Sequence, residues 1–324
     1  MTDGEPFSDE AYSSFIFRLA LWHPRFSKSP EFVEEAYRTS LQRHPLDPDY
    51  YAASFFGDVA AKALEEIFPN RNFDFMLAKL SSFVMPLYYR RSYCFDCMVE
   101  QIKGAWSPAV LKRWGLVYYC VCDAHNIPLS DAPQRGNNKA NNAQYFFCFH
   151  ANRRSPVPIN CFSDDALMAG LEVQRFMASI DVEPGLAPTP LLEFCRIVLE
   201  IFLYPDYGIC NAPQARKGVS VHSPEWERSC FGPLWATILE RQSAMLLLGW
   251  ILGLPGVKLD FLPNQMGARI ALAYLDQRGL GIAASFLPDS IYKMQSLRLC
   301  LLKDNMSLLA VNDFVEGFVS RLQG

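Results

Sequence analysis

Four residues in the middle of the chain have the types and the spacing of a metal site. Cys94 and Cys97 are separated by two residues, and Cys122 and His125 repeat this spacing after 24 intervening residues. Two short-spaced pairs of sulfur and nitrogen ligands, brought together by folding, are typical of a closed tetrahedral zinc site. Because four protein ligands leave no coordination position for water, the predicted Zn²⁺ supplies folding energy and shape rather than catalysis.

Other interpretations of the cysteines stay open at the level of sequence. One alternative is that the four residues form no site and have this spacing by chance in a chain with 10 cysteines. Another is that the CxxC is a redox pair, which needs an exposed, activated thiol near a helix N-terminus. Cys120 is an alternative ligand, although the CxxH spacing favours Cys122. A second metal site built from Cys148, His150 and Cys161 has irregular spacing and no evident fourth ligand, so core or surface placement is the simpler interpretation.

The charge is unevenly distributed along the chain. The formal net charge is −4 in total, with a balance of −5 over residues 1–85, +5 over 86–160 and −4 over 161–324. A basic module between acidic flanks suits local contact with nucleic acid, but the chain as a whole lacks the basic excess of a tight DNA binder, which favours protein partners. Either the basic side chains around the knuckle form an ordinary solvated face, or they contact phosphates; they are Arg90, Arg91, Lys112, Arg113, Lys139, Arg153 and Arg154.

Composition places the chain among folded intracellular proteins. Half of its 324 residues are hydrophobic and 20% are charged, which excludes a disordered chain. The acidic, polar N-terminus lacks the apolar core of a signal peptide, so we expect a cytoplasmic, nucleoid-associated protein in a reducing compartment. The longest apolar run, 244–254, is too short to span a membrane and predicts a buried helix.

Hydrophobic periodicity predicts a mainly α-helical fold with a small β-containing zinc knuckle. Tyrosine- and valine-rich segments from residue 88 to 119 favour short strands, and the segment 130–142 predicts an exposed loop. We expect a helical N-terminal region at 1–86, the knuckle module at 87–162 and a helical C-terminal domain at 163–324. The predicted helices cover 8–22, 30–41, 58–67, 73–84, 164–180, 190–203, 234–252, 266–277, 291–303 and 311–322.

The sequence around the knuckle resembles the TniQ/TnsD family of transposon target-selection proteins. The segments LYYRRSYCFDCMVE and LKRWGLVYYCVCDAHNIPL are similar to the family's CPxC-like pair, Trp-containing segment and CPxHGxxL-like pair, with Trp114 as the tryptophan. The N-terminal residues EAYSSF, followed by Arg18-Leu19-Ala20, look like the family's ESxxSW…RLA opening. The resemblance covers residues 8–130. This chain lacks the prolines inside both pairs and the glycine after His125, but it keeps all four metal ligands.

The resemblance implies a non-enzymatic adaptor for DNA transposition. Such a protein links a target DNA site, or an RNA-guided CRISPR effector complex, to an AAA+ ATPase that positions the transposase. The acidic C-terminal region is then a platform for a partner or for a homodimer. No GxSxG, Walker A or HExxH motif suggests catalysis. Two alternatives are a zinc-containing, sequence-specific DNA-binding regulator outside transposition, and an enzyme with a structural zinc ion and a deep polar C-terminal pocket.

Overall fold

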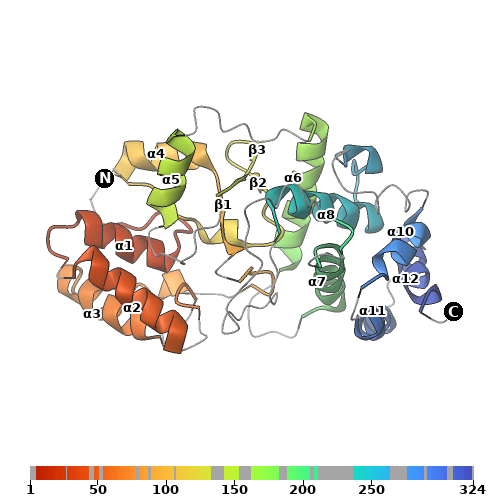
Figure 1. Cartoon of the computed structure of the whole chain (residues 1–324), viewed down its shortest axis with the longest axis horizontal. Helices are drawn as coiled ribbons and strands as arrows, with labels where there is room; N and C mark the ends of the chain where they lie inside the picture. The colour runs from red at the N-terminus through yellow and green to blue at the C-terminus, as the bar shows by residue number, and fades with distance from the viewer. Residues whose placement is uncertain are drawn as a thin grey trace.

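The structure, a computed structural model, is mainly helical (Figure 1). Among the residues that it describes are eleven α-helices and two sheets of two strands each, which confirms the predicted fold class. In this part of the chain, no helix is both long enough and apolar enough to cross a membrane. The described residues are 5–26, 28–43, 47–50, 54–77, 81–86, 89–105, 107–132, 142–152, 162–181, 188–204, 208–210, 236–262, 276–287, 290–304 and 309–322.

Three helices form the N-terminal region: α1 (Tyr12–Trp22), α2 (Pro30–Arg43) and α3 (Phe55–Ile67). They pack around a cluster of buried aromatic rings that includes Phe15, Tyr37 and Phe56. The α3 helix begins after Ser54, whose side chain accepts a hydrogen bond from the Gly57 N–H. All three helices agree with the hydrophobic periodicity of the sequence.

The predicted helix at 73–84 is wrong. Among the described residues of this segment, only a short 3-10 helix, η1 (Asp74–Leu77), forms. After it, the backbone of Phe83 and Met85 is hydrogen-bonded to the knuckle segment: the Val117 N–H donates to Phe83 O, and the Met85 N–H donates to Gly115 O. Tertiary pairing therefore replaces the helical hydrogen bonds that the apolar periodicity favours.

The central part contains short strands and two helices that the sequence analysis did not predict, α4 (Phe95–Ala105) and α5 (Asn142–Asn152). The strands are β1 (Ser92–Tyr93), β2 (Val121–Cys122), β3 (Ile127–Pro128) and β4 (Ser130–Asp131). β1 pairs with β4 and β2 pairs with β3, both antiparallel. A 3-10 helix, η3 (Lys112–Gly115), connects α4 to β2.

The C-terminal region is built from α6 (Asp164–Ile180), α7 (Pro190–Phe202), α8 (Ile238–Ile251), α10 (Gln277–Ala284), α11 (Ser290–Asp304) and α12 (Leu309–Ser320), with a 3-10 helix, η4 (Leu259–Phe261). Ser163, Thr189 and Thr237 cap the first three of these helices through their hydroxyl oxygens. α8 is buried on nearly all sides, as its apolar run predicts. The helix predicted at 266–277 falls almost wholly outside the described residues.

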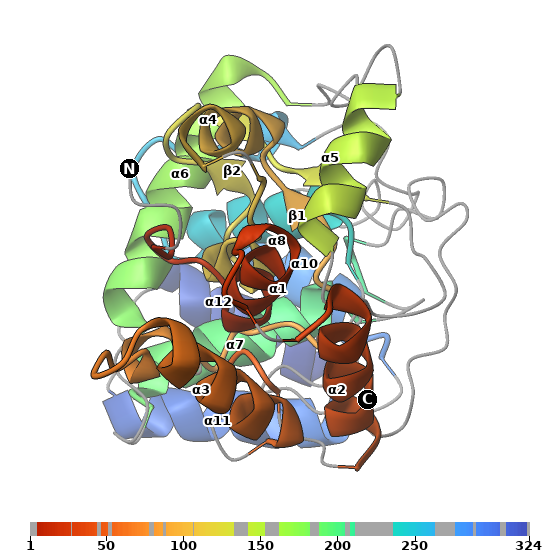
Figure 2. The ribbon, with the colours of Figure 1, turned by 90° about the vertical axis from the view of Figure 1, so that its left-hand side faces the viewer.

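The three parts are distributed along the long axis of the molecule. The N-terminal helices lie at one end and α10 to α12 at the other; α4 and α5 of the central segment lie at the same end as α1, and its strands lie toward the middle (Figure 1). Figure 2 looks onto the end that holds the N-terminal helices. One large buried cluster extends from Phe83 to Val319 and includes residues of both the central segment and the C-terminal region. The division at residues 86 and 162 therefore stays a prediction, because the central segment shares its core with the C-terminal helices.

Candidate metal centre

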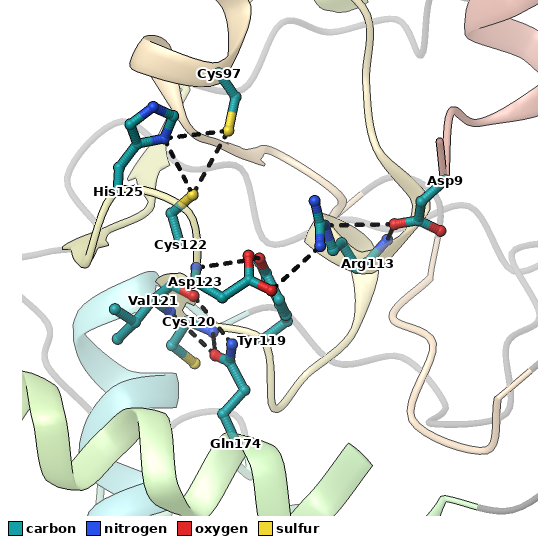
Figure 3. Close-up of polar contacts among 10 residues, drawn as sticks. All are labelled: Asp9, Cys97, Arg113, Tyr119, Cys120, Val121, Cys122, Asp123, His125 and Gln174. Carbon is teal, nitrogen blue, oxygen red and sulfur yellow. Dashed lines mark hydrogen bonds and ion pairs between the residues drawn. The ribbon is translucent and has the colours of Figure 1, made fainter. Parts of the chain in front are cut away.

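The structure brings the four predicted ligands together. Cys94, Cys97, Cys122 and His125 place their ligand atoms within 4.8 Å of one another, and they are the group of potential metal ligands found in the part of the chain that the structure describes. The three cysteines are buried and free of disulfide bonds, and His125 is half-buried. Figure 3 shows the side chains of Cys97, Cys122 and His125 pointing toward a common centre.

The spacing of these atoms fits a tetrahedral ion. For Zn–S bonds of about 2.3 Å and a Zn–N bond of about 2.05 Å, ideal tetrahedral angles give S···S separations of about 3.8 Å and S···N separations of about 3.6 Å. The Sγ atoms of Cys97 and Cys122 lie 3.5 Å apart. His125 Nδ1 lies 3.5 Å from Cys94 Sγ, 3.4 Å from Cys97 Sγ and 3.5 Å from Cys122 Sγ. The cluster can therefore hold one metal ion with little rearrangement.

The choice of ligands within the cluster is clear. Cys120 is buried, but its thiol is directed to the carbonyl oxygen of Val117, 3.5 Å away, and it takes no part in the cluster. Cys122 is therefore the cysteine that pairs with His125, as the CxxH spacing predicts. The burial of Cys94 and Cys97 also argues against an exposed redox pair.

Electrostatics around the cluster favour a bound cation. Hydrogen bonding to Cys122 raises the pKa of the Cys94 thiol to about 12, and it raises the pKa of Cys97 further. Hydrogen bonds from the Cys94 and Cys97 thiols lower the pKa of Cys122 well below its ordinary value. The close approach of the three sulfur atoms therefore opposes the formation of three thiolates unless a cation lies among them. A divalent cation would replace the thiol protons and stabilise all three thiolates.

Two local features orient the ligands. Cys94 directly precedes α4 and Cys97 lies in its first turn, where the unpaired N–H groups and the helix dipole stabilise thiolates. The Nε2 atom of His125 lies 3.2 Å from Glu100 Oε1 on the same helix. If Nδ1 binds the metal, Nε2 carries the proton and donates to this carboxylate, which is the usual outer-shell arrangement of a metal-binding histidine.

The turn between β2 and β3 contains a residue in the left-handed region. Asn126, which follows His125, has a φ of 53° and donates its backbone N–H to the carbonyl oxygen of Cys122 at 2.7 Å. Glycine adopts this conformation most easily, and asparagine tolerates it better than most other residues. The sequence therefore meets the geometric demand of the turn with asparagine.

Two side chains from the C-terminal helices hold the metal-binding segment in place. Gln174 on α6 accepts hydrogen bonds from the N–H groups of Cys120 and Val121 and donates to the Val121 carbonyl, at 3.0 to 3.2 Å. Arg241 on α8 is fully buried. It donates to the carbonyl oxygens of residues 116, 117 and 119 and to the hydroxyl oxygen of Ser92. Sequence reasoning missed both residues, since neither belongs to a local motif.

The N-terminal helix docks against the other side of the knuckle. Glu10 and Arg18 form a buried ion pair at 2.8 Å, and the Ser14 hydroxyl donates to Glu10 at 3.4 Å. Ser14 also accepts a hydrogen bond from the Val110 N–H, and Glu10 forms an antiparallel bridge with Leu111. The polar residues of the N-terminal motif thus fix α1 to the segment between α4 and η3.

The basic residues predicted to contact phosphates have partners within the protein. Arg90 pairs with Asp47 and is buried beside Asp49, and Arg91 is buried and donates to the carbonyl oxygen of Ala132. Both are too enclosed to contact a nucleic acid, so the structure does not support their predicted role as phosphate contacts.

The other basic candidates divide into two groups. Arg113 lies between Asp9 and Asp123 (Figure 3), and Lys112 donates to the carbonyl oxygen of Met76. These contacts neutralise Arg113 and anchor Lys112, which weakens the case for phosphate binding. The remaining three candidates lie outside the described residues; they are Lys139, Arg153 and Arg154.

The second metal site finds no support in the residues that are described. His150 stacks on Phe95 with ring centroids 3.9 Å apart, and its Nδ1 lies 3.1 Å from the Tyr93 hydroxyl. Cys148 is exposed, and Cys161 lies outside the described residues. His150 is therefore best described as a packing residue that secures α5 against α4.

Comparisons with protein families, with characterised proteins and with solved structures found no match to this chain.

Proposed function

We propose that the ion held by this cluster is zinc and that its role is structural. Three thiolates and one imidazole form a ligand set that suits Zn²⁺, and all four positions around the ion are filled by protein. The burial of the cysteines supports a closed site. Such an ion stabilises the fold and does not activate water.

Metal analysis of the purified chain tests this proposal directly. We expect close to one zinc per chain in the wild-type protein, and loss of zinc with lower solubility in Cys94→Ser and His125→Ala. Cys148→Ser is a matched control, since this cysteine is exposed and outside the cluster. A wild-type protein that is folded but free of metal, with soluble and normally folded variants, contradicts the proposal.

We further propose that the protein is an adaptor for target selection in DNA transposition, as its resemblance to the TniQ/TnsD family suggests. One observation carries this proposal: the two sequence segments of the resemblance, far apart in the chain, form a single packed unit. Glu10, Ser14 and Arg18 bind one another beside the knuckle, and Ser14 accepts a hydrogen bond from the segment that precedes Trp114. The two motifs of the resemblance therefore belong to one structural unit, which supports the proposal.

The turn after His125 adds support. Family members have glycine where this chain has Asn126, and the backbone at this position is left-handed. A divergent member can replace the glycine only with a residue that tolerates this conformation, and asparagine is the first choice. Asn126 therefore keeps the backbone conformation that a glycine would adopt at this position.

An exposed aromatic side chain on the N-terminal helices marks one place for a protein partner. Of the four aromatic residues of α1, Tyr12, Phe15 and Phe17 are buried in the core, whereas Trp22 is 59% exposed. Exposed tryptophan is enriched where proteins bind one another. We propose that this end of the molecule contacts the AAA+ ATPase or the targeting complex.

A pull-down of the tagged chain from its host, with and without nuclease, tests the adaptor function. Recovery of an AAA+ ATPase or of CRISPR effector subunits after nuclease treatment supports it. We expect Trp22→Ser to reduce this recovery, while Tyr292→Ser, a matched change of an exposed aromatic residue on α11, leaves it unchanged. Specific DNA without either protein would instead favour the zinc-containing regulator, and the adaptor function would be abandoned.

A further inference from the structure

A cavity of about 360 Å³ lies where the N-terminal region, the knuckle and the C-terminal region meet. Phe7, Tyr50 and Phe75 line it from the N-terminal region, Lys112 and Tyr118 line it from the knuckle, and Asp181 lines it from the end of α6. Its volume is at the lower end of the range of small-ligand sites, about 300–1,000 Å³. The side chain of Phe75 is 64% exposed, so the cavity has an apolar residue that solvent can reach.

Most charged groups around this cavity are neutralised within the protein. Glu10 is paired with Arg18, and Arg113 is shared by Asp9 and Asp123. These five side chains carry three negative and two positive charges, and each of them is engaged in an ion pair. These ion pairs also hold the walls of the cavity in place. The pair of Arg113 with Asp9 joins the knuckle to the N-terminal region, and the other two pairs join residues within one region.

Two charged groups of opposite sign lack an ionic partner within 4 Å, although Asp49, Asp9 and Asp47 stabilise the charge of Lys112 from a greater distance. Among the residues that the structure describes, Lys112 has no carboxylate within 4 Å, and its ammonium group donates to the carbonyl oxygen of Met76 and lies over the ring of Tyr50. Asp181 has no cation within this distance and accepts hydrogen bonds from the hydroxyl groups of Ser81 and Tyr118.

Burial makes these two charges costly in the absence of a ligand. It lowers the pKa of Lys112 and raises the pKa of Asp181, since the charged form of each is poorly solvated. An opposite charge brought by a ligand would offset this cost at each group. Lys112 has further ammonium protons to donate, and Asp181 has further carboxylate lone pairs to accept.

We propose that this cavity binds a small zwitterion with an apolar body, of the size of an aromatic amino acid or a dipeptide. Its carboxylate would pair with Lys112 and its ammonium group with Asp181, while the apolar part would contact the rings that line the cavity. A purely anionic ligand would meet Asp181, a purely cationic ligand would meet Lys112, and a neutral apolar ligand would leave both charges buried. This site is separate from the metal centre and does not depend on the adaptor function.

Calorimetric titration of the zinc-loaded full-length chain tests the proposal with three related probes. L-Phenylalanine carries both charges, N-acetyl-L-phenylalanine only the carboxylate, and L-phenylalaninamide only the ammonium group. We expect L-phenylalanine to bind. Each blocked analogue should have an affinity at least about tenfold lower, since each loses one hydrogen-bonded ion pair. L-Leucine and glycyl-L-phenylalanine extend the panel in size and shape.

Two variants assign the charges. In Asp181→Asn, we expect the preference for L-phenylalanine over its N-acetyl form to disappear while the preference over the amide persists. Lys112→Met should show the reverse. Because Lys112 also bonds to the backbone, thermal unfolding of each variant is measured alongside, and Asp181→Asn keeps the test valid if Lys112→Met fails to fold. Absence of binding by every probe at millimolar concentration, or equal binding of L-phenylalanine and both blocked analogues, overturns the proposal.

Discussion

The substitution Arg241→Met tests whether α8 holds the metal-binding segment. In the wild-type protein the buried guanidinium donates to the carbonyl oxygens of Leu116, Val117 and Tyr119 at 2.6 to 3.0 Å and to Ser92 Oγ at 2.8 Å. Methionine has a similar length and a flexible apolar stem, so it fills most of the same space. It removes every donor of the guanidinium, so the Leu116 carbonyl keeps only the Tyr119 N–H and the Val117 carbonyl keeps only the Cys120 thiol.

The expected loss in the free energy of unfolding follows from the hydrogen bonds that Arg241 makes. A hydrogen bond to a charged group contributes about 1.5–3 kcal/mol, and Arg241 makes four. Removing the guanidinium also removes the cost of burying its charge, so the sum overstates the loss. We expect the free energy of unfolding to fall by about 3–5 kcal/mol, which is a large fraction of the roughly 5–15 kcal/mol typical of folded proteins.

Urea unfolding of the zinc-loaded protein measures this change, and chelator competition measures zinc affinity in parallel. We expect affinity to fall about tenfold or more, because the segment that contains Cys122 loses its support. Arg298→Met, at an exposed position of α11, is the matched control and should change neither quantity. If Arg241→Met unfolds within about 1 kcal/mol of the wild-type protein, the assignment of Arg241 as the support of this segment is refuted.

Three further substitutions test separate features of the fold. Asn126→Gly should leave thermal stability and zinc content close to wild type, whereas Asn126→Val should lower the free energy of unfolding by about 1–2 kcal/mol, because valine is strained at a positive φ. Gly281→Ala should cost about 1–3 kcal/mol in urea unfolding, because its Cβ would meet the Phe314 carbonyl oxygen at 2.0 Å across the α10–α12 contact. Burial raises the pKa of Asp181, so the folded state holds this proton more tightly than the unfolded state, and stability falls as pH rises through the range between the two pKa values. Asp181→Asn should remove this fall and be more stable at neutral pH, and unchanged pH profiles of unfolding would contradict the reasoning.

The metal cluster and most helices could be predicted because their signals are local. The ligand pairs have fixed short spacings, and helices such as α6 and α7 have capping residues directly before a periodic apolar run. In α8 the apolar run predicts a buried helix, and the structure agrees. Each of these predictions depends on residues within about four positions of one another, where sequence distance and spatial distance agree.

The errors arise where tertiary contacts decide. The periodicity at 73–84 favours a helix, but the backbone of Phe83 and Met85 pairs with residues more than 25 positions away. The sequence does not predict α4, because the CxxC spacing is typical of a tight turn, although Phe95 to Ala105 has helical periodicity of its own. The basic residues illustrate the same limit: a net charge of +5 predicts an accessible surface only if the cations lack partners, and Asp47 and Asp49 come from a different segment.

The size of the strands explains why the metal centre needs support from both sides. Each strand of the knuckle has only two residues, and a two-stranded hairpin even of ordinary length is marginally stable by itself. Ligand positions in such a segment are therefore set by other groups. Gln174 and Arg241 hold the backbone around β2 from the C-terminal side, while Ser14 and Glu10 hold the segment before η3 from the N-terminal side.

This arrangement makes the metal ion and the distant side chains parts of one stabilising system. If the cluster binds the proposed zinc ion, the ion would fix the N-terminal end of α4 and the β2–β3 turn, and the fixed backbone would present its N–H and carbonyl groups to Gln174 and Arg241. Coupling between two sites is reciprocal by thermodynamic necessity. A substitution that loosens these hydrogen bonds should therefore also lower the affinity of the cluster for the ion. The knuckle is joined in this way to helices on both sides, which suits the proposed role of an adaptor between two partners.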